Sequence, residues 1–137
     1  MTVFELDSYH TLFVKNARDC LNNLKTNLIT YNSSTSQEKI TKVTEMFRLA
    51  HMIKGQSAFM NYQNTTRYCL LLERVFKTVK EKNFVFNSNQ IDQLIQVLDT
   101  LSKNLDAIDH QKKEIDLTEK INSLEQIYKN QYENSHH

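Results

Sequence analysis

The sequence contains very few of the residues that make turns: its 137 residues include one glycine and no proline. A β-sandwich or β-barrel needs a turn about every ten residues, so this scarcity argues against both and favours a few long helices. The sequence also has no run of eighteen apolar residues, and no basic segment with an apolar core at its N-terminus. We therefore expect an all-α protein that is soluble and has no membrane partner.

Strong charge of either sign is absent as well, because the formal net charge is +1. There is no block of five like charges and no basic stripe with interleaved aromatic residues, so a nucleic-acid partner is not favoured. The two cysteines, Cys20 and Cys69, lack metal-ligand spacing and fall on apolar helical faces. We expect buried free thiols, no metal site and a reducing, cytoplasmic environment.

Apolar residues recur at three- and four-residue steps over most of the chain, which is the spacing of helices with one buried face. The pattern predicts four helices, over about residues 5–30, 36–59, 64–81 and 87–110. A fifth, over about 113–129, has a narrower apolar stripe, which leaves three roles open: covering the bundle, docking a partner, or leading into a linker. We expect one domain over 1–130, with a four-helix core over about 4–110 and a flexible tail over 131–137.

Several polar residues indicate where these helices begin and end. Thr35 with Glu38 three residues later, and Asn87 with Gln90, have the spacing of N-terminal caps. Asn61 follows the second helix, and asparagine tolerates the positive φ that often ends a helix. In the connection before the fourth helix, Phe84 and Phe86 alternate with polar residues. We expect these two rings to hold that connection against the bundle.

The single glycine, Gly55, lies inside the second predicted helix, where it costs about 1 kcal/mol relative to alanine. It follows His51 by four residues, and residues four apart are neighbours on a helix surface. A need for a surface without a side chain beside His51 would explain why glycine stands here despite this cost. Lys54, three residues after His51, places an ammonium on the same patch.

His51 and Glu73 are both expected at the rim between core and solvent. The apolar stripe of the second helix centres near Ala50, and that of the third on Leu72. Each polar residue is the next in sequence, about 100° around its helix. Two rim residues on adjacent antiparallel helices can meet.

The string Phe47-Arg48-x-Ala50-His51-x-Ile53-Lys54-Gly55-x-Ser57, with Leu72-Glu73 in the following helix, resembles a known family. It is similar to histidine-containing phosphotransfer (HPt) domains, most of all to the N-terminal phosphoacceptor domain of chemotaxis-type histidine kinases. The resemblance covers about residues 4–110 and implies an antiparallel four-helix bundle. It also implies that His51 accepts a phosphoryl group through Nε2, from a kinase ATP-binding domain or a receiver aspartate, and passes it to a response-regulator receiver.

The resemblance assigns roles to further residues. Glu73 would hold the other ring nitrogen of His51, Lys54 would offset charge on the incoming phosphoryl group, and Gly55 would admit the donor's active site. We expect the receiver to dock around His51, on Gly55 and on the exposed residues Thr44, Arg48, Met52 and Gln56. This chain has no glycine-rich phosphate loop of its own, so ATP would be bound by the partner or kinase domain. The resemblance implies that Mg²⁺ would be bound there as well.

One family feature is missing, since Leu70 stands where a second histidine is common. His10 and His110 have no partners at ligand spacing, so we expect them at the surface.

The context of the module stays open at this stage. The chain can be a stand-alone relay or part of a larger histidine kinase, with the kinase domain in cis or in trans, so whether it counts as an enzyme is undecided. A second hypothesis is a non-catalytic helical docking module that sequesters a signalling partner. A metal-binding bundle is a distant third, because no ligand pairs converge in the core pattern. A monomer is expected.

Overall fold

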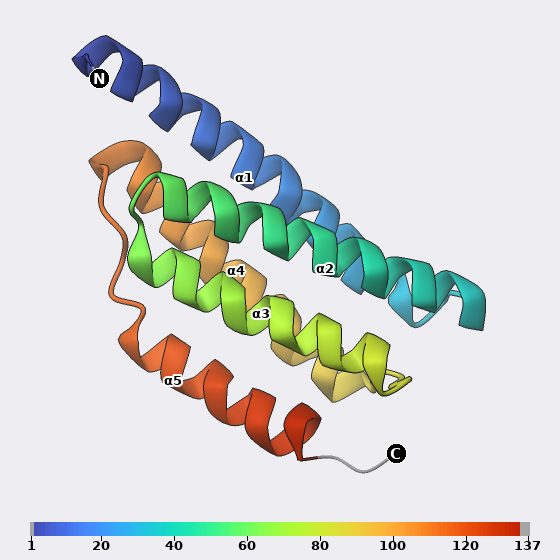
Figure 1. Cartoon of the computed structure of the whole chain (residues 1–137). Helices are drawn as coiled ribbons and strands as arrows, with labels where there is room; N and C mark the ends of the chain where they lie inside the picture. The colour runs from blue at the N-terminus through green and yellow to red at the C-terminus, as the bar shows by residue number, and fades with distance from the viewer. Residues whose placement is uncertain (1, 135–137) are drawn as a thin grey trace.

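Five α-helices follow one another in the computed structural model, which describes residues 2–134 (Figure 1). They are α1 (Val3–Tyr31), α2 (Ser36–Phe59), α3 (Gln63–Glu81), α4 (Ser88–Gln111) and α5 (Thr118–Ile127). A short π-helix, Tyr128–Glu133, continues α5. Residues 2–134 contain no strand. The expected all-α bundle with a fifth C-terminal helix is therefore confirmed.

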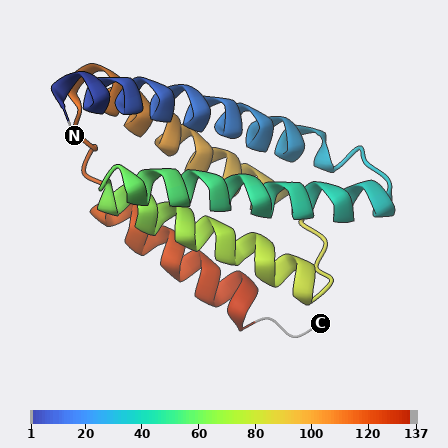
Figure 2. The same ribbon diagram turned by 45° about the horizontal axis from the view of Figure 1, so that its top comes forward.

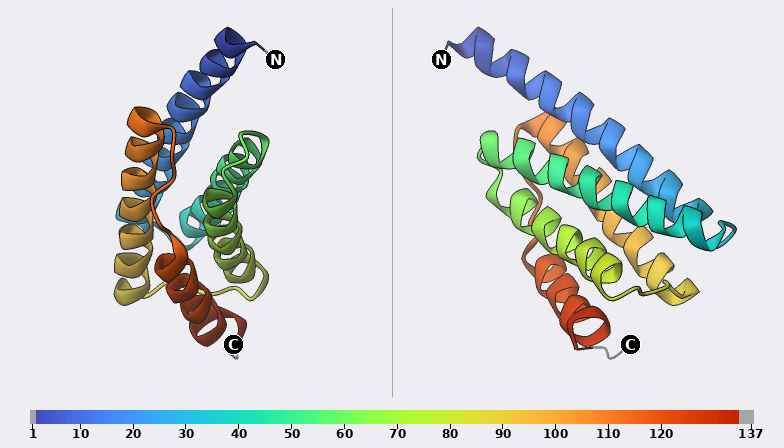
Figure 3. Two further views of the ribbon diagram at one scale, coloured as in Figure 1. Left: turned by 90° about the vertical axis from the view of Figure 1, so that its left-hand side faces the viewer. Right: turned by 45° about the vertical axis from the view of Figure 1, so that its right-hand side comes forward.

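The first four helices form an antiparallel bundle in which α2 packs against both α1 and α3, and α1 also packs against α4 (Figure 1). The fifth helix contacts α3 and runs beside it on the side away from α2 (Figure 2). The N-terminal turns of α1 extend past the ends of α2 and α3 (Figure 3). Within the described residues, no helix is both long and apolar enough to span a membrane.

The helix boundaries follow from the capping residues that the sequence indicated. Thr35 accepts the backbone N–H of Glu38 while the Glu38 carboxylate accepts that of Thr35, and Asn87 and Gln90 form the same reciprocal pair. Asn61 adopts φ 63° directly after α2. Its N–H and that of Tyr62 donate to carbonyl groups in the last turn of α2, at 3.0 and 2.9 Å, as in a Schellman motif.

One core runs through the bundle and is built from the predicted apolar stripes. On α2, Leu49 belongs to this core, whereas Phe47 is only half-buried. Cys20 and Cys69 are free and buried as expected, and burial raises the pKa of the Cys69 thiol to about 12. The largest fully buried side chains include Tyr31, Tyr68, Tyr132, Phe76, Leu24, Leu28, Met46, Leu71 and Leu72.

The α3–α4 connection is held against the bundle by its two phenylalanines, as expected. Phe84 and Phe86 are 9% and 3% exposed. The Phe86 ring meets the Tyr31 ring edge-to-face, with centroids 5.2 Å apart, and its backbone N–H donates to the Tyr31 hydroxyl at 3.2 Å. The α3–α4 connection is therefore packed against the C-terminal end of α1.

The fifth helix begins at Thr118, five residues later than predicted. Lys112 ends α4 with φ 55°, and residues 113–117 cross from α4 to α3 without helical structure. Polar contacts hold this segment: Glu114 accepts from the N–H and hydroxyl of Thr65, and Ile115 donates its N–H to Asn104. Because these partners are distant in sequence, helical periodicity alone could not reveal the crossing.

The C-terminal end of the domain also differs from the expectation of a tail over 131–137. The π-helix runs to Glu133, and Tyr132 is fully buried with its ring near those of Phe84 and Phe86. Residues 135–137 lie outside the described residues. Of the three roles left open for the fifth helix, the structure shows that it covers one side of the bundle.

Candidate functional site

His51 projects from the middle of α2, beside its buried stripe. Ala50 is fully buried, whereas 60% of the His51 side chain is exposed. The predicted rim position is therefore confirmed. The ring of Phe47, one turn earlier, lies nearly parallel to the imidazole, with centroids 6.3 Å apart. Sequence reasoning missed this contact, although the i, i+4 spacing could have indicated it.

Glu73 projects from α3 toward α2 and is more buried than the rim position predicted. Only 11% of its side chain is exposed. The helical wheel of α3 gives the angle of Glu73 from the core but not which flank the next helix covers. Because α2 packs on the Glu73 flank, the carboxylate is enclosed, while Arg74, the next residue, stays exposed.

The Glu73 carboxylate bridges two side chains of α2. Oε1 lies 2.9 Å from Nδ1 of His51, and Oε2 lies 2.6 Å from Nζ of Lys54. His51 and Lys54 are three residues apart and therefore neighbours on one helix face. The structure thus brings together the three residues that the sequence singled out for chemistry.

The charge of Glu73 determines which ring nitrogen of His51 carries the proton. Burial by itself raises the pKa of Glu73, but the hydrogen bonds and positive charges of Lys54 and His51 together bring it below its ordinary value. An ionised carboxylate only accepts hydrogen bonds, so Nδ1 of His51 must carry a proton to satisfy this contact. In the neutral ring, Nε2 then holds the free lone pair.

Lys54 was expected to offset charge on the incoming phosphoryl group, but in the structure its partner is Glu73. Its ammonium is paired with Glu73, and 24% of its side chain is exposed. In this arrangement it balances the charge of the enclosed carboxylate and keeps that carboxylate ionised beside His51.

The residues expected to form the docking surface do not all reach solvent equally. Thr44, Arg48 and Gly55 are exposed on the His51 side of α2. Met52 and Gln56, which were expected to be exposed, are half-buried. Both lie farther around α2, where Met52 packs against the core and Gln56 borders a groove shared with α1.

Arg48 is held in place on this surface by its neighbours on α2. Its guanidinium donates to the Glu45 carboxylate, at 3.0 Å through Nε, and approaches the Met52 sulfur at 2.9 Å.

Gly55 has open space where a side chain would begin. A Cβ built on its backbone meets no atom within 4 Å. The fold of this chain therefore does not require glycine at this position, one turn beyond His51. That observation agrees with a surface kept bare for another molecule.

Ser57, the last residue of the motif, has a structural position that sequence reasoning did not anticipate. It is fully buried, donates to the Lys54 carbonyl at 3.0 Å and lies 2.9 Å from the Thr66 hydroxyl. The contact ties α2 to α3 near Lys54. The one signal in the sequence is that this serine falls on the apolar side of the helix.

His10, His110 and Leu70 take no part in the polar contacts of this cluster. Leu70 is half-buried and offers no polar group to the site. His110 is exposed, as expected, and its Nδ1 lies 2.8 Å from the Asp106 carbonyl. His10 was expected at the surface but is 8% exposed, whereas residues 2–9 before it are all exposed. Within residues 2–134, no three His, Cys, Asp or Glu side chains converge to hold a metal ion.

Comparison with known proteins agrees with this geometry. The family model described as Hpt domain matches residues 8–111. The chemotaxis protein CheA of Bacillus subtilis (strain 168) is 25% identical over 104 residues, which is 76% of this chain and 15% of the relative.

Two further relatives carry the same description. CheA of Borreliella burgdorferi is 23% identical over 107 residues, covering 77% of this chain and 12% of the relative. CheA of Halobacterium salinarum is 23% identical over 103 residues, covering 75% and 15%. The chain thus spans only 12–15% of the length of these relatives.

Proposed function

Because this chain belongs to the Hpt domain family, we propose that His51 is its phosphoacceptor and that Glu73 and Lys54 prepare the imidazole for the reaction. The family match and the chemotaxis relatives make the chain a histidine phosphotransfer module of chemotaxis or two-component signalling. The observation that carries the proposal is the 2.9 Å contact of Glu73 with Nδ1, which leaves Nε2 as the unprotonated nitrogen on an exposed ring.

In the proposed reaction, the lone pair of Nε2 forms a bond to phosphorus. The bond from phosphorus to the leaving oxygen breaks at the same time, and that oxygen keeps its electron pair. The ring gains positive charge, which the carboxylate of Glu73 stabilises through the proton on Nδ1. No proton has to leave the ring, so the phosphoryl group can pass onward by the reverse sequence to an aspartate carboxylate.

The proposed partners are a histidine-kinase ATP-binding domain as donor and a response-regulator receiver as acceptor. ATP and Mg²⁺ would be bound by these partners, and the metal would supply positive charge to the phosphoryl oxygens during transfer. We place the domain in the cytoplasm, since its two cysteines are free thiols. The relatives suggest that it works as the phosphoacceptor part of a larger chemotaxis kinase, with a stand-alone relay as the other context.

A labelling experiment tests the assignment of His51. The domain is incubated with radiolabelled ATP and a chemotaxis-type kinase core, or with a phosphorylated receiver, beside the variants His51→Gln and His110→Gln. We expect acid-labile, base-stable label on the wild type and on His110→Gln, and a loss of at least about 100-fold in His51→Gln, because the nucleophile is gone. Label that persists in His51→Gln would refute the assignment.

The same variant separates phosphotransfer from sequestration. A docking module that only captures its partner keeps its signalling output when His51 is replaced, as long as the partner still binds. Phosphotransfer instead predicts that His51→Gln binds the receiver with unchanged affinity while the output disappears.

A further inference from the structure

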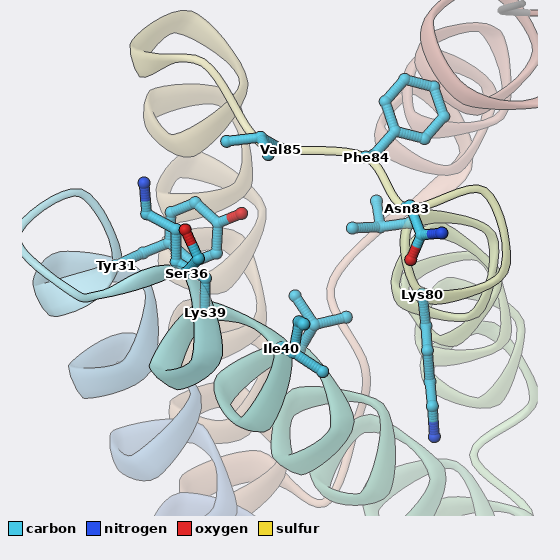
Figure 4. Close-up of a pocket in the computed structure, with 10 residues that line it drawn as sticks. Tyr31, Ser36, Lys39, Ile40, Lys80, Asn83, Phe84 and Val85 are labelled. Carbon is cyan, nitrogen blue, oxygen red and sulfur yellow. The ribbon is translucent and has the colours of Figure 1, made fainter. Parts of the chain in front are cut away.

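A pocket of about 340 Å³ opens at the end of the bundle where the α1–α2 and α3–α4 connections meet (Figure 4). Its walls come from the last residue of α1, the first two turns of α2, the end of α3 and the connection that follows. None of His51, Lys54 and Glu73 lines it. The volume is at the lower end of the range for small-molecule sites.

The inner surface of this pocket is largely apolar. Val43, Val79 and Phe84 are buried, whereas Ile40 and Val85 at the mouth are 54% and 64% exposed. Exposed aliphatic side chains around a concave apolar surface are stabilised when a ligand covers them.

Tyr31 supplies a hydrogen-bond donor without an acceptor. The residue is 1% exposed, and its hydroxyl oxygen accepts the Phe86 N–H. Burial raises the pKa of Tyr31, although the Phe86 contact lowers it, so the hydroxyl keeps its proton at neutral pH. Among residues 2–134 that proton has no acceptor, and in Figure 4 the hydroxyl points toward the middle of the pocket. A buried donor of this kind is unfavourable until an oxygen atom accepts from it.

A positive charge lies on the same side of the pocket. The ammonium of Lys39 is 5.1 Å from the centroid of the Tyr31 ring, and no ion pair engages it among the described residues. The nearby carboxylate of Glu38 is occupied with the backbone N–H of Thr35. In Figure 4 the nitrogen of Lys80 lies on the opposite side and points away from Tyr31. No acidic residue lines the pocket.

We propose that this pocket binds a small amphipathic carboxylate. The carboxylate accepts the Tyr31 O–H and lies beside Lys39, while the apolar body covers Ile40 and Val85 and packs against Phe84. At about 30 Å³ per water-sized atom, the volume admits roughly ten non-hydrogen atoms. A medium-chain fatty acid or a small aryl acid has this size and chemistry.

Octanoate is a suitable probe, and NMR of the ¹⁵N-labelled chain reports where it binds. We expect saturable shifts confined to residues around the pocket, with a Kd of about 1 mM or below for a ligand of this size. Octylammonium, which has the same chain and the opposite charge, is expected to bind at least about fivefold more weakly, because Lys39 repels it.

Two variants test the polar end of the site. Lys39→Gln and Tyr31→Phe are each expected to weaken octanoate binding by about fivefold. Lys42→Gln is the matched control: it removes the same charge three residues along α2, outside the pocket lining, and should leave the Kd within about twofold. Tyr31→Phe also removes the acceptor of the Phe86 N–H, so Lys39→Gln decides the question if Tyr31→Phe unfolds.

Three results would overturn the proposal: no saturable binding of octanoate to about 10 mM, equal binding of octanoate and octylammonium, or full octanoate affinity in Lys39→Gln. If octanoate does not bind but Lys39→Gln weakens binding of a receiver domain, the pocket belongs to a protein interface and the small-molecule site is also refuted. These readouts do not involve phosphorylation of His51, so they stand apart from the proposed function.

Discussion

At the scale of single residues, Glu73 has the largest consequences, because one carboxylate holds both His51 and Lys54. Its folded-state pKa lies below the ordinary 4.5, so the ionised form contributes stability above the unfolded-state pKa. That contribution is lost as the pH falls from 4.5 through the lower, folded-state pKa.

We expect the free energy of unfolding of Glu73→Gln to be about 1–3 kcal/mol lower than that of the wild type at pH 7, because Lys54 loses its partner. The difference should shrink as the pH falls toward 3. Urea unfolding at pH 7, 5 and 3 measures it, and a difference that stays constant over this range would contradict the ionised bridge.

The same variant is expected to slow phosphorylation of His51 by about 10- to 100-fold. A glutamine can still accept from Nδ1, but it carries no charge to stabilise the developing imidazolium. Initial labelling rates with a fixed kinase core measure this effect. Asp109→Asn is the matched control, because it removes the charge of a carboxylate that pairs with Arg18 away from the site. This variant should keep the wild-type rate.

Gly55 is the second residue with a separable role, since nothing in this chain occupies the space of its missing side chain. Gly55→Ala is expected to raise the free energy of unfolding by about 0.5–1 kcal/mol, because alanine is the better helix former. It should also slow transfer from the kinase or to the receiver by about tenfold, because a methyl group would displace the partner.

Chemical denaturation and transfer rates measured on the same preparation test the Gly55 prediction. Lys103→Ala, which shortens an exposed side chain on α4 outside the expected docking surface, is the control and should leave both quantities nearly unchanged. If Gly55→Ala were more stable and transferred the phosphoryl group at the wild-type rate, the absence of a side chain at this position would have no role in the approach of a partner.

At the scale of elements, the end of α2 depends on the left-handed backbone of Asn61. Alanine in this conformation is expected to lower the free energy of unfolding by about 1 kcal/mol, whereas glycine should raise it by a few tenths. Thermal unfolding of Asn61→Ala and Asn61→Gly measures the difference. Equal melting temperatures for the two variants would show that the turn relaxes to another conformation.

At the scale of the whole molecule, α5 and the site lie on opposite sides of α3, since α2 packs on one flank and α5 runs along the other (Figure 1). The family match also ends at residue 111, before α5 begins. Stability and phosphotransfer should therefore separate when α5 is removed.

Deleting residues 112–137 exposes the surface that Leu117, Leu124 and Tyr132 cover, and we expect the free energy of unfolding to fall by about 2–5 kcal/mol. The labelling rate of His51 should stay within about twofold of the full chain. Leu124→Ala gives the same comparison if the shortened chain does not fold. A tenfold slower rate in a folded variant would place α5 in the docking of a partner.

Much of this fold follows from local sequence information. The bounds of α2, the reciprocal caps at Thr35 and Asn87 and the left-handed Asn61 all depend on residues within four positions of one another. The rim position of His51 follows from the same periodicity. These features could be read from the sequence because hydrogen bonding and side-chain neighbours along a helix are determined by spacing alone.

What only the tertiary structure decided concerns which helix covers which flank. Enclosure by α2 made Glu73 a buried bridge and engaged Lys54 with it, and the contacts of Glu114 with Thr65 delayed the start of α5. The pocket beside Tyr31 likewise forms only where two connections meet. The sequence by itself determined the helices and the string of residues around His51. Packing between distant segments determined the charge environment of that histidine, because burial and ion pairing depend on neighbours that helical periodicity does not specify.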